Sequence, residues 1–228
     1  MNKKILIVSG ALIIFSIVLY ILSNVMFNTE KIQQNNQQPI NENDTEVELS
    51  TESMIFPLDM DTSNELIEQS KKMFDLALGK SREWRSDSSP VAVLVQYTDS
   101  IKKENGKNTF IFISPSLPQF YFVFEASQRD DSFSEISYKR SIQFREDYFL
   151  REDVVVMPMK YWVLSFIEAL KKADDLGGKE VRVKNNKYDV NMLLSKREGG
   201  FLNWEVEYLV DGLRNFSSTI DAYKGEVQ

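Results

Sequence analysis

Apolar and polar residues alternate along the chain in patterns that predict a helix followed by strands, twice over. Between residues 61 and 84, apolar and small side chains recur at spacings of three and four, the period of a helix with one buried face. Asp61, Thr62 and Ser63 are candidate N-cap residues at its start. Dense or alternating β-branched and aromatic residues then predict four strands, at 91–98, 109–114, 119–127 and 133–144.

The second half of the chain repeats this order. A helix is expected to begin near Pro158, a residue suited to the first helical position, and to end at Gly177-Gly178. Three dipeptides of the first helix recur one hundred positions later, namely Ile67-Glu68, Lys71-Lys72 and Asp75-Leu76. Both a duplication and the common surface composition of helices explain this match. Four short strands are expected to follow, at 179–184, 188–196, 202–210 and 215–221.

We therefore predict an α+β fold, in which an N-terminal transmembrane helix precedes two helix-plus-antiparallel-meander halves. The first half covers residues 53–150 and the second covers residues 151–228. Each helix is expected to cover the apolar face of its own sheet.

The N-terminal segments predict a membrane anchor and a tether. Residues 5–27 form an apolar run that would span about 34 Å as a helix, enough to cross a bilayer core of about 30 Å. A cleaved signal peptide is the alternative, but its apolar region is usually shorter and a small-residue cleavage site follows it. Lys3 and Lys4 lie in the short tail 1–4, which we expect in the cytoplasm. Residues 28–52 are polar and acidic, and they are expected to be a disordered tether.

Composition and charge exclude several classes of function. The chain is 43% hydrophobic with fifteen Phe, which suffices for a packed core, and its net charge is −7. It contains neither Cys nor His, so thiolate chemistry, disulfides and the commonest general base and metal ligand are missing. No stretch forms a basic face, so nucleic acid is not an expected partner. We expect no enzyme activity, no cofactor and no metal site.

The C-terminal segment resembles the end of PepSY and PepSY-like domains. The resemblance rests on Trp204-Glu205-Val206-Glu207-Tyr208 and on the run 218–227, which reads STIDAYKGEV and departs from the family at Lys224. We expect Trp204 and Ile220 on adjacent strands, and a turn in which Gly225 takes a positive φ. The resemblance implies an extracytoplasmic domain, often tethered by one N-terminal helix, that binds or inhibits other proteins, chiefly peptidases.

Few side chains form candidate sites. The acidic pairs Asp130-Asp131 and Asp174-Asp175 offer oxygen ligands for a hard cation, but no calcium-loop spacing accompanies them, and a structural role at a turn and a helix end is expected. Ser114 and Ser165 have no His as a base. In the aromatic run 120–124, one face must be core. On the other face, the residues predicted as a possible partner surface are Tyr121, Val123 and Glu125, and burial against a neighbouring helix is the alternative.

From these observations we expect a single-pass cell-membrane protein whose C-terminal domain lies outside the cytoplasm. Its expected function is to bind, regulate or help assemble another envelope or membrane protein. An extracytoplasmic sensor or carrier of a small ligand, held in a cleft, is the alternative. A weaker alternative is a carboxylate-based hydrolase of the envelope, which requires two carboxylates about 5–9.5 Å apart.

Overall fold

The computed structural model describes residues 55–228. The predicted tail, anchor and tether at 1–4, 5–27 and 28–52 lie outside these residues. Among residues 55–228, no helix is long and apolar enough to cross a membrane. In chain order the elements are α2 (Met60–Trp84), β1 (Ser89–Tyr97), η2 (Lys103–Asn105), β2 (Gly106–Ile113), β3 (Phe120–Ser127), β4 (Phe133–Lys139), α3 (Ile142–Asp147), β5 (Val154–Val155), η3 (Met159–Tyr161), α4 (Phe166–Ala173), the π-helix η4 (Asp174–Gly178), α5 (Lys179–Lys184), β6 (Asp189–Arg197), β7 (Leu202–Val210) and β8 (Leu213–Asp221).

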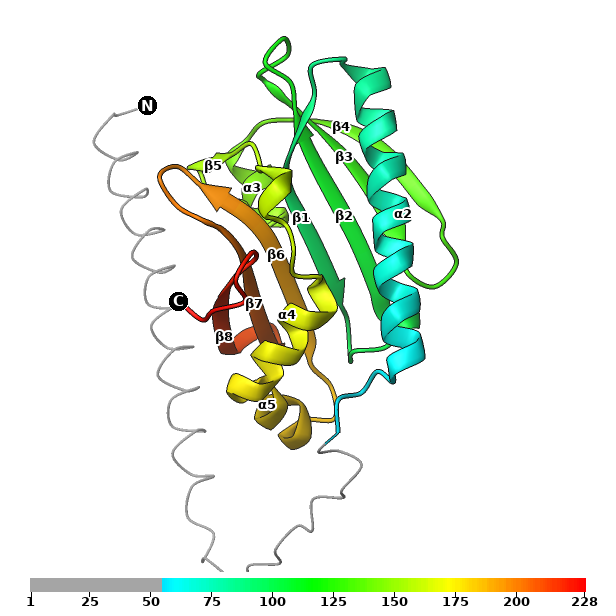
Figure 1. Cartoon of the computed structure of the whole chain (residues 1–228), viewed down its shortest axis with the longest axis vertical. Helices are drawn as coiled ribbons and strands as arrows, with labels where there is room; N and C mark the ends of the chain where they lie inside the picture. The colour runs from blue at the N-terminus through cyan, green and yellow to red at the C-terminus, as the bar shows by residue number, and fades with distance from the viewer. Residues whose placement is uncertain (1–54) are drawn as a thin grey trace, which may run out of the picture. The chain divides into compact units, whose positions relative to one another are not determined.

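One continuous antiparallel sheet of eight strands dominates the fold (Figure 1). Its strand order is β4-β3-β2-β1-β6-β7-β8, and β5 pairs with the end of β6. The predicted fold class is therefore wrong, because the two halves do not form separate sheets, each with its own helix. They are joined by backbone pairing between β1 and β6, which runs from Ala92↔Ser195 to Tyr97↔Val190.

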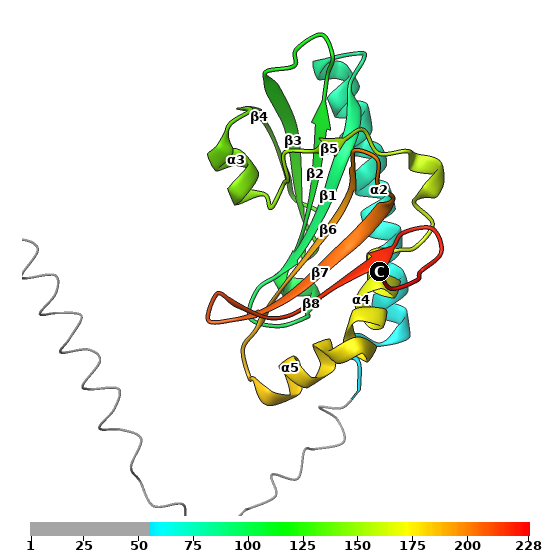
Figure 2. The same ribbon diagram turned by 90° about the vertical axis from the view of Figure 1, so that its left-hand side faces the viewer.

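The main core lies between one face of this sheet and the helices α2 and α4. Figure 2 shows these two helices on the same side of the sheet. The first predicted helix is present as α2, and its N-cap is Asp59, whose side chain accepts a hydrogen bond from the Thr62 backbone N–H at 2.7 Å. Its buried residues repeat every three or four positions, and Phe74 packs edge-on against Phe110 of β2 at 5.6 Å between ring centroids.

The second helical region differs from the prediction at both ends. Pro158 precedes only the short η3, and α4 begins at Phe166, after a capping box formed by Ser165 and Glu168. The helix then widens into η4, where Gly177 has φ +142°, and continues as α5. The predicted strand at 179–184 is therefore wrong. Its alternating charged and apolar residues also suit one short helix, in which Arg182 reaches back to Asp174.

The predicted C-terminal hairpin is present in β7 and β8. Trp204 pairs with Ile220, both fully buried, as the sequence predicted. The Trp204 indole N–H donates to the Leu164 carbonyl at 3.0 Å, and this hydrogen bond attaches the hairpin to the segment before α4. After β8, Asp221 accepts hydrogen bonds from two backbone N–H groups of the turn, and Gly225 has φ +71°, also as predicted.

The other face of the sheet carries a smaller core under α3 (Figure 2). The predicted strand 133–144 ends at Lys139, because Ser141 caps α3 by accepting from the Phe144 backbone N–H at 3.0 Å. The Phe144 ring stacks on Tyr121 with centroids 4.6 Å apart. Tyr121 and Val123 are thus buried, and of the three residues predicted as a partner surface only Glu125 reaches solvent.

Candidate functional site

The outer face of β6, β7 and β8 carries no helix among residues 55–228 (Figure 2). Side chains alternate along β7, so Trp204, Val206 and Tyr208 point into the main core. Glu205 and Glu207 therefore point to the uncovered face. Because α3 covers only the neighbouring part of the sheet, this face forms a floor with α3 and the following loop as one wall.

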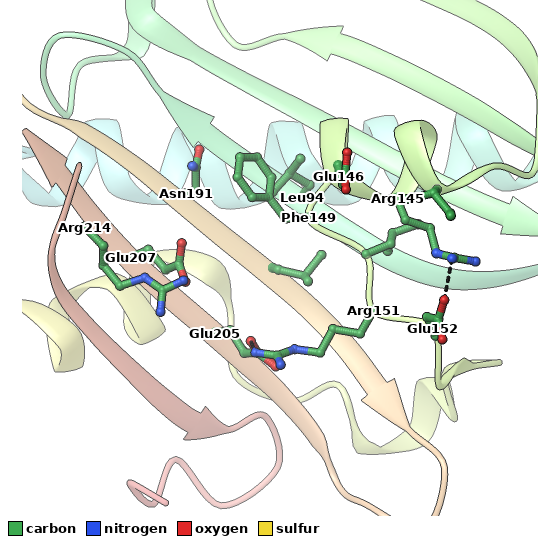
Figure 3. Close-up of a pocket in the computed structure, with 13 residues that line it drawn as sticks. Leu94, Arg145, Glu146, Phe149, Arg151, Glu152, Asn191, Glu205, Glu207 and Arg214 are labelled. Atoms are coloured by element: carbon green, nitrogen blue, oxygen red, sulfur yellow. Dashed lines mark hydrogen bonds and ion pairs between the residues drawn. The ribbon is translucent and has the colours of Figure 1, made fainter. Parts of the chain in front are cut away.

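A pocket of ≈ 440 Å³ lies at this junction (Figure 3). Its apolar floor is built from Leu94 of β1 and Leu193 of β6, and Leu150 from the loop after α3 packs beside them. Its rim is charged, because three arginines and four glutamates line it, namely Arg145, Arg151, Arg214, Glu146, Glu152, Glu205 and Glu207. The pocket therefore combines an apolar floor with groups of both signs.

Ion pairs hold most of the rim side chains in place. Glu205 is paired with two arginines, Arg151 at 2.9 Å and Arg197 at 2.5 Å. Arg214 of β8 contacts Glu207 at 2.7 Å. On the wall, Arg145 of α3 contacts Glu152 at 2.6 Å. These ion pairs connect β7 to β6, to β8 and to the loop after α3, and they hold the charged side chains around the apolar floor.

The pairing also sets the protonation of Glu205. Burial by itself would raise the pKa of this carboxyl, but hydrogen bonds from Arg197 and Arg151 outweigh burial and lower the pKa below its usual 4.5. Glu205 and Glu207 are alternate residues on one strand, so they share one face and their Cα atoms lie about 7 Å apart. The general acid of a glycosidase must hold a proton, and a lowered pKa leaves Glu205 without one to donate near neutral pH.

Two apolar side chains project beside this charged rim. Ile142, the first residue of α3, is 66% exposed, and Phe149 is 40% exposed. Phe149 has φ +57°, a left-handed backbone conformation that costs a bulky L-residue energy. The Leu150 backbone N–H, which donates to the Arg145 carbonyl at 2.8 Å, closes the turn around it. An exposed aromatic residue is thus held in a strained conformation at the mouth of the pocket.

A second pocket, of ≈ 340 Å³, lies on the helical side of the sheet between α2 and the start of α4. Phe74, Trp162 and Phe166 supply its apolar lining. Lys71 and Asp75 of α2 and Ser165 add polar groups at its edge. This pocket has the mixture of apolar lining and few polar groups that small-molecule sites show.

The acidic pairs proposed as cation ligands have structural partners. Asp174 is buried and bound by Arg182, with Nε at 2.9 Å from Oδ1 and Nη2 at 2.8 Å from Oδ2. Asp130 accepts a hydrogen bond from the Ser132 hydroxyl at 2.7 Å, and Gln69 donates to Asp131. Within residues 55–228, no three His, Cys, Asp or Glu side chains are grouped to hold a metal ion.

The two serines considered as nucleophiles also have local roles. Ser114 donates to Asp87 at 2.5 Å, and Ser165 is the N-cap of α4. In contrast, no motif or pattern in the sequence marks Ile142 and Phe149 as candidate site residues. The outward-facing Glu205 and Glu207 were visible as the polar half of an alternating strand, but the positive φ of Phe149 has no counterpart in the sequence.

No family model, no curated protein and no solved structure matches this chain. The resemblance to PepSY domains therefore stays a prediction from residues 204–227.

Proposed function

We propose that residues 55–228 form a non-catalytic domain that binds, and thereby regulates or helps assemble, another protein of the membrane or envelope. The single observation that carries this proposal is the uncovered sheet face with Phe149 and Ile142 at the mouth of the charged pocket. The apolar run at 5–27, with Lys3 and Lys4 before it and a segment poor in Lys and Arg after it, supports a position outside the cytoplasm.

The chemistry of the pocket favours a protein over other partners. Its lining residues carry a net charge of −1, from three arginines and four glutamates, so no positive field attracts nucleic acid or an anionic surface. A protein segment with one large apolar side chain would fill the apolar floor, and polar groups beside that side chain would meet the mixed rim. Apolar anchors inside a polar rim are the usual anatomy of a protein interface.

The paired carboxylates favour binding over hydrolysis. A general acid must hold a proton near the working pH, which requires a raised pKa. The pKa of Glu205 is lowered, and an arginine also contacts Glu207. Ion-paired side chains that face solvent are better suited to exchange partners with an incoming protein.

Site-specific photocrosslinking of the full chain in intact cells tests the proposal. p-Benzoylphenylalanine would replace Phe149 in one sample and Tyr223 in a matched control, an aromatic residue 56% exposed in the turn after β8. We expect one defined protein adduct from position 149 that disappears with Ile142→Asp, and no such adduct from position 223. Equal adducts at both positions, or none at position 149, would overturn the proposal.

A carrier of a small apolar ligand is a second candidate, because of the pocket between α2 and α4. Its test uses the dye 1-anilinonaphthalene-8-sulfonate with the folded full chain. Saturable binding that Phe166→Ala weakens at least tenfold, with the fold intact, would favour this role. Binding that does not saturate would speak against it.

A further inference from the structure

Among residues 55–228, the two edge strands of the sheet differ, because C-terminal residues pair with β8 and no segment pairs with the outer side of β4. At β8, the C-terminal residues return to the edge, where the Gln228 N–H donates to the Thr219 carbonyl at 3.0 Å and Val227 forms a bridge with Ile220. At the opposite edge, within residues 55–228, β4 pairs only with β3. The outer side of β4 is thus the open edge of the described sheet.

The hydrogen bonds at the two ends of the β3–β4 ladder show which β4 residues point outward. The Arg140 N–H donates to the Gln119 carbonyl, and the Ser127 N–H donates to the Ser132 carbonyl, both at 2.8 Å. Bonded and non-bonded pairs alternate along an antiparallel ladder, so even-numbered residues of this strand bond to β3. The backbone groups of residues 133, 135, 137 and 139 consequently face away from the sheet.

Of the features that usually prevent strand pairing, this edge has two charged residues, Glu135 and Lys139, but lacks the backbone irregularities. Its register with β3 is regular over seven residue pairs, and it contains neither a proline nor a bulge. Two apolar side chains stay exposed on it, Phe133 at 48% and Ile136 at 39%. Its charged residues, Glu135 and Lys139, are of opposite sign and cancel, so they do not repel a second copy of the same strand.

We propose that β4 pairs with β4 of a second copy of this chain, antiparallel, with the two Ile136 residues opposite one another on a twofold axis. In this register residues 133 and 135 face residues 139 and 137 of the partner strand. All four outward-facing residues then bond to outward-facing residues, which an antiparallel ladder requires. The two sheets would become one continuous sheet with an isologous interface.

This register pairs all seven residues of β4, whereas a centre at position 135 or 137 would pair only five of them. Shifting the centre to position 135 would place two Glu135 carboxylates directly opposite one another, which is destabilising. With Ile136 at the centre, two apolar side chains meet instead, and Phe133 lies across from the alkyl stem of Lys139. Glu135 then faces Ser137 of the other copy, with Lys139 and Glu135 of that copy on its two diagonals, and it keeps its ion pair with Lys80 of α2 at 3.6 Å. A twofold pairing uses the whole length of β4 and places no like charges directly opposite one another, and on this ground the proposed occupant is a second copy of the chain.

The absence of cysteine from the sequence makes a disulfide test possible. In a non-hydrogen-bonded antiparallel pair the Cα atoms lie about 4.5 Å apart, within the range a disulfide spans. The full chain carrying Ile136→Cys, in detergent and under mild oxidant, should form a covalent dimer. Two controls should stay monomeric, Ser134→Cys, which faces position 138 of the partner, and Leu213→Cys, which is exposed on the other edge.

A second variant distinguishes a disulfide that forms within a strand-paired dimer from one that forms when two molecules collide by chance. Ser137→Pro removes an outward N–H and leaves the bonds to β3 in place, so it should reduce the Ile136→Cys dimer at least tenfold. If the proline variant fails to fold, light scattering of the wild-type chain decides, because the proposal requires a mass that doubles as concentration rises. A monomer at all concentrations, a Leu213→Cys dimer formed as fast as the Ile136→Cys dimer, or a mixed disulfide with another protein would overturn it.

Discussion

Asp174 and Arg182 form a buried two-pronged ion pair across the π-helix η4, and both side chains are only 5% exposed. The Tyr208 hydroxyl of β7 also donates to Asp174, at 3.3 Å. Burial and the nearby Asp174 carboxylate raise the pKa of Tyr208 well above its usual value, so the hydroxyl keeps its proton. The pair thus holds α5 against the end of the sheet.

Removing one member of this pair should destabilise the domain strongly. We expect Arg182→Met to lower the free energy of unfolding by about 3–5 kcal/mol, because Asp174 would stay buried without its main partner. Denaturant unfolding of the full chain, followed by Trp fluorescence, measures the change. The matched control is Lys184→Met, an exposed member of a surface pair with Glu180, which should change stability by less than about 0.5 kcal/mol.

The double variant Asp174→Leu/Arg182→Met completes this experiment. It removes both charges from the interior, so it should be more stable than Arg182→Met alone. Equal stability of the single and double variants would show that the ion pair is not what holds α5 in place.

Two glycines should respond to alanine in opposite directions. A Cβ on Gly178 would lie 2.5 Å from the Tyr208 ring, so Gly178→Ala should lower the free energy of unfolding by about 1–3 kcal/mol. Gly79, in the C-terminal part of α2 before its last turn, has nothing within 4 Å of an added Cβ, and Gly79→Ala should raise stability by about 0.5–1 kcal/mol. Thermal unfolding of both variants tests this, and a stabilised Gly178→Ala variant would contradict the packing described.

Local patterns predicted most elements because each depends on residues close in sequence. The helix at 60–84 and the strand at 202–210 follow from periodicity alone, and the turn at Gly225 follows from its neighbours. The strand prediction for residues 179–184 was wrong because these six residues suit either a strand or a helix. The partner that decides between them, Asp174, lies in the preceding helix.

The continuous sheet and the pocket could not be predicted because they depend on long-range pairing. β1 and β6 are about one hundred residues apart. β1 is apolar on both faces and β6 is apolar on one face, and neither pattern identifies the neighbouring strand. The burial of Tyr121 likewise depends on Phe144, from a helix that the sequence suggested as the end of a strand. The site is assembled from four strands, a short helix and a loop, and only its two glutamates left a signal.

The ion pairs of Glu205 should make stability depend on pH. A carboxyl whose pKa is lower in the folded than in the unfolded chain adds stability above its unfolded pKa and loses it as the pH falls through the folded value. For Glu205 that loss should begin near its usual pKa of 4.5 and continue below it. At pH 7 we expect Glu205→Gln to cost about 1 kcal/mol, a modest value because both arginines are partly exposed.

The pH profile is the decisive measurement for Glu205. The difference in unfolding free energy between wild type and Glu205→Gln should shrink as the pH is lowered from 7 to 3. Glu180→Gln, at an exposed surface pair, is the control and should show a smaller difference at every pH. A Glu205→Gln difference that is constant over this range would mean that the two arginines do not lower the pKa of Glu205.

The strain at Phe149 can be separated from the loss of its ring by comparing two substitutions. Phe149→Ala and Phe149→Gly both remove the aromatic side chain, but only glycine adopts φ +57° without cost. We therefore expect the glycine variant to be more stable than the alanine variant by about 1 kcal/mol, against the usual order for an exposed loop position. Both should lose the protein adduct measured by a crosslinker at Ile142, because both lack the ring. If the Phe149→Ala variant is more stable than the Phe149→Gly variant, the turn after α3 is not strained. The argument that the fold holds Phe149 in place for binding would then be wrong.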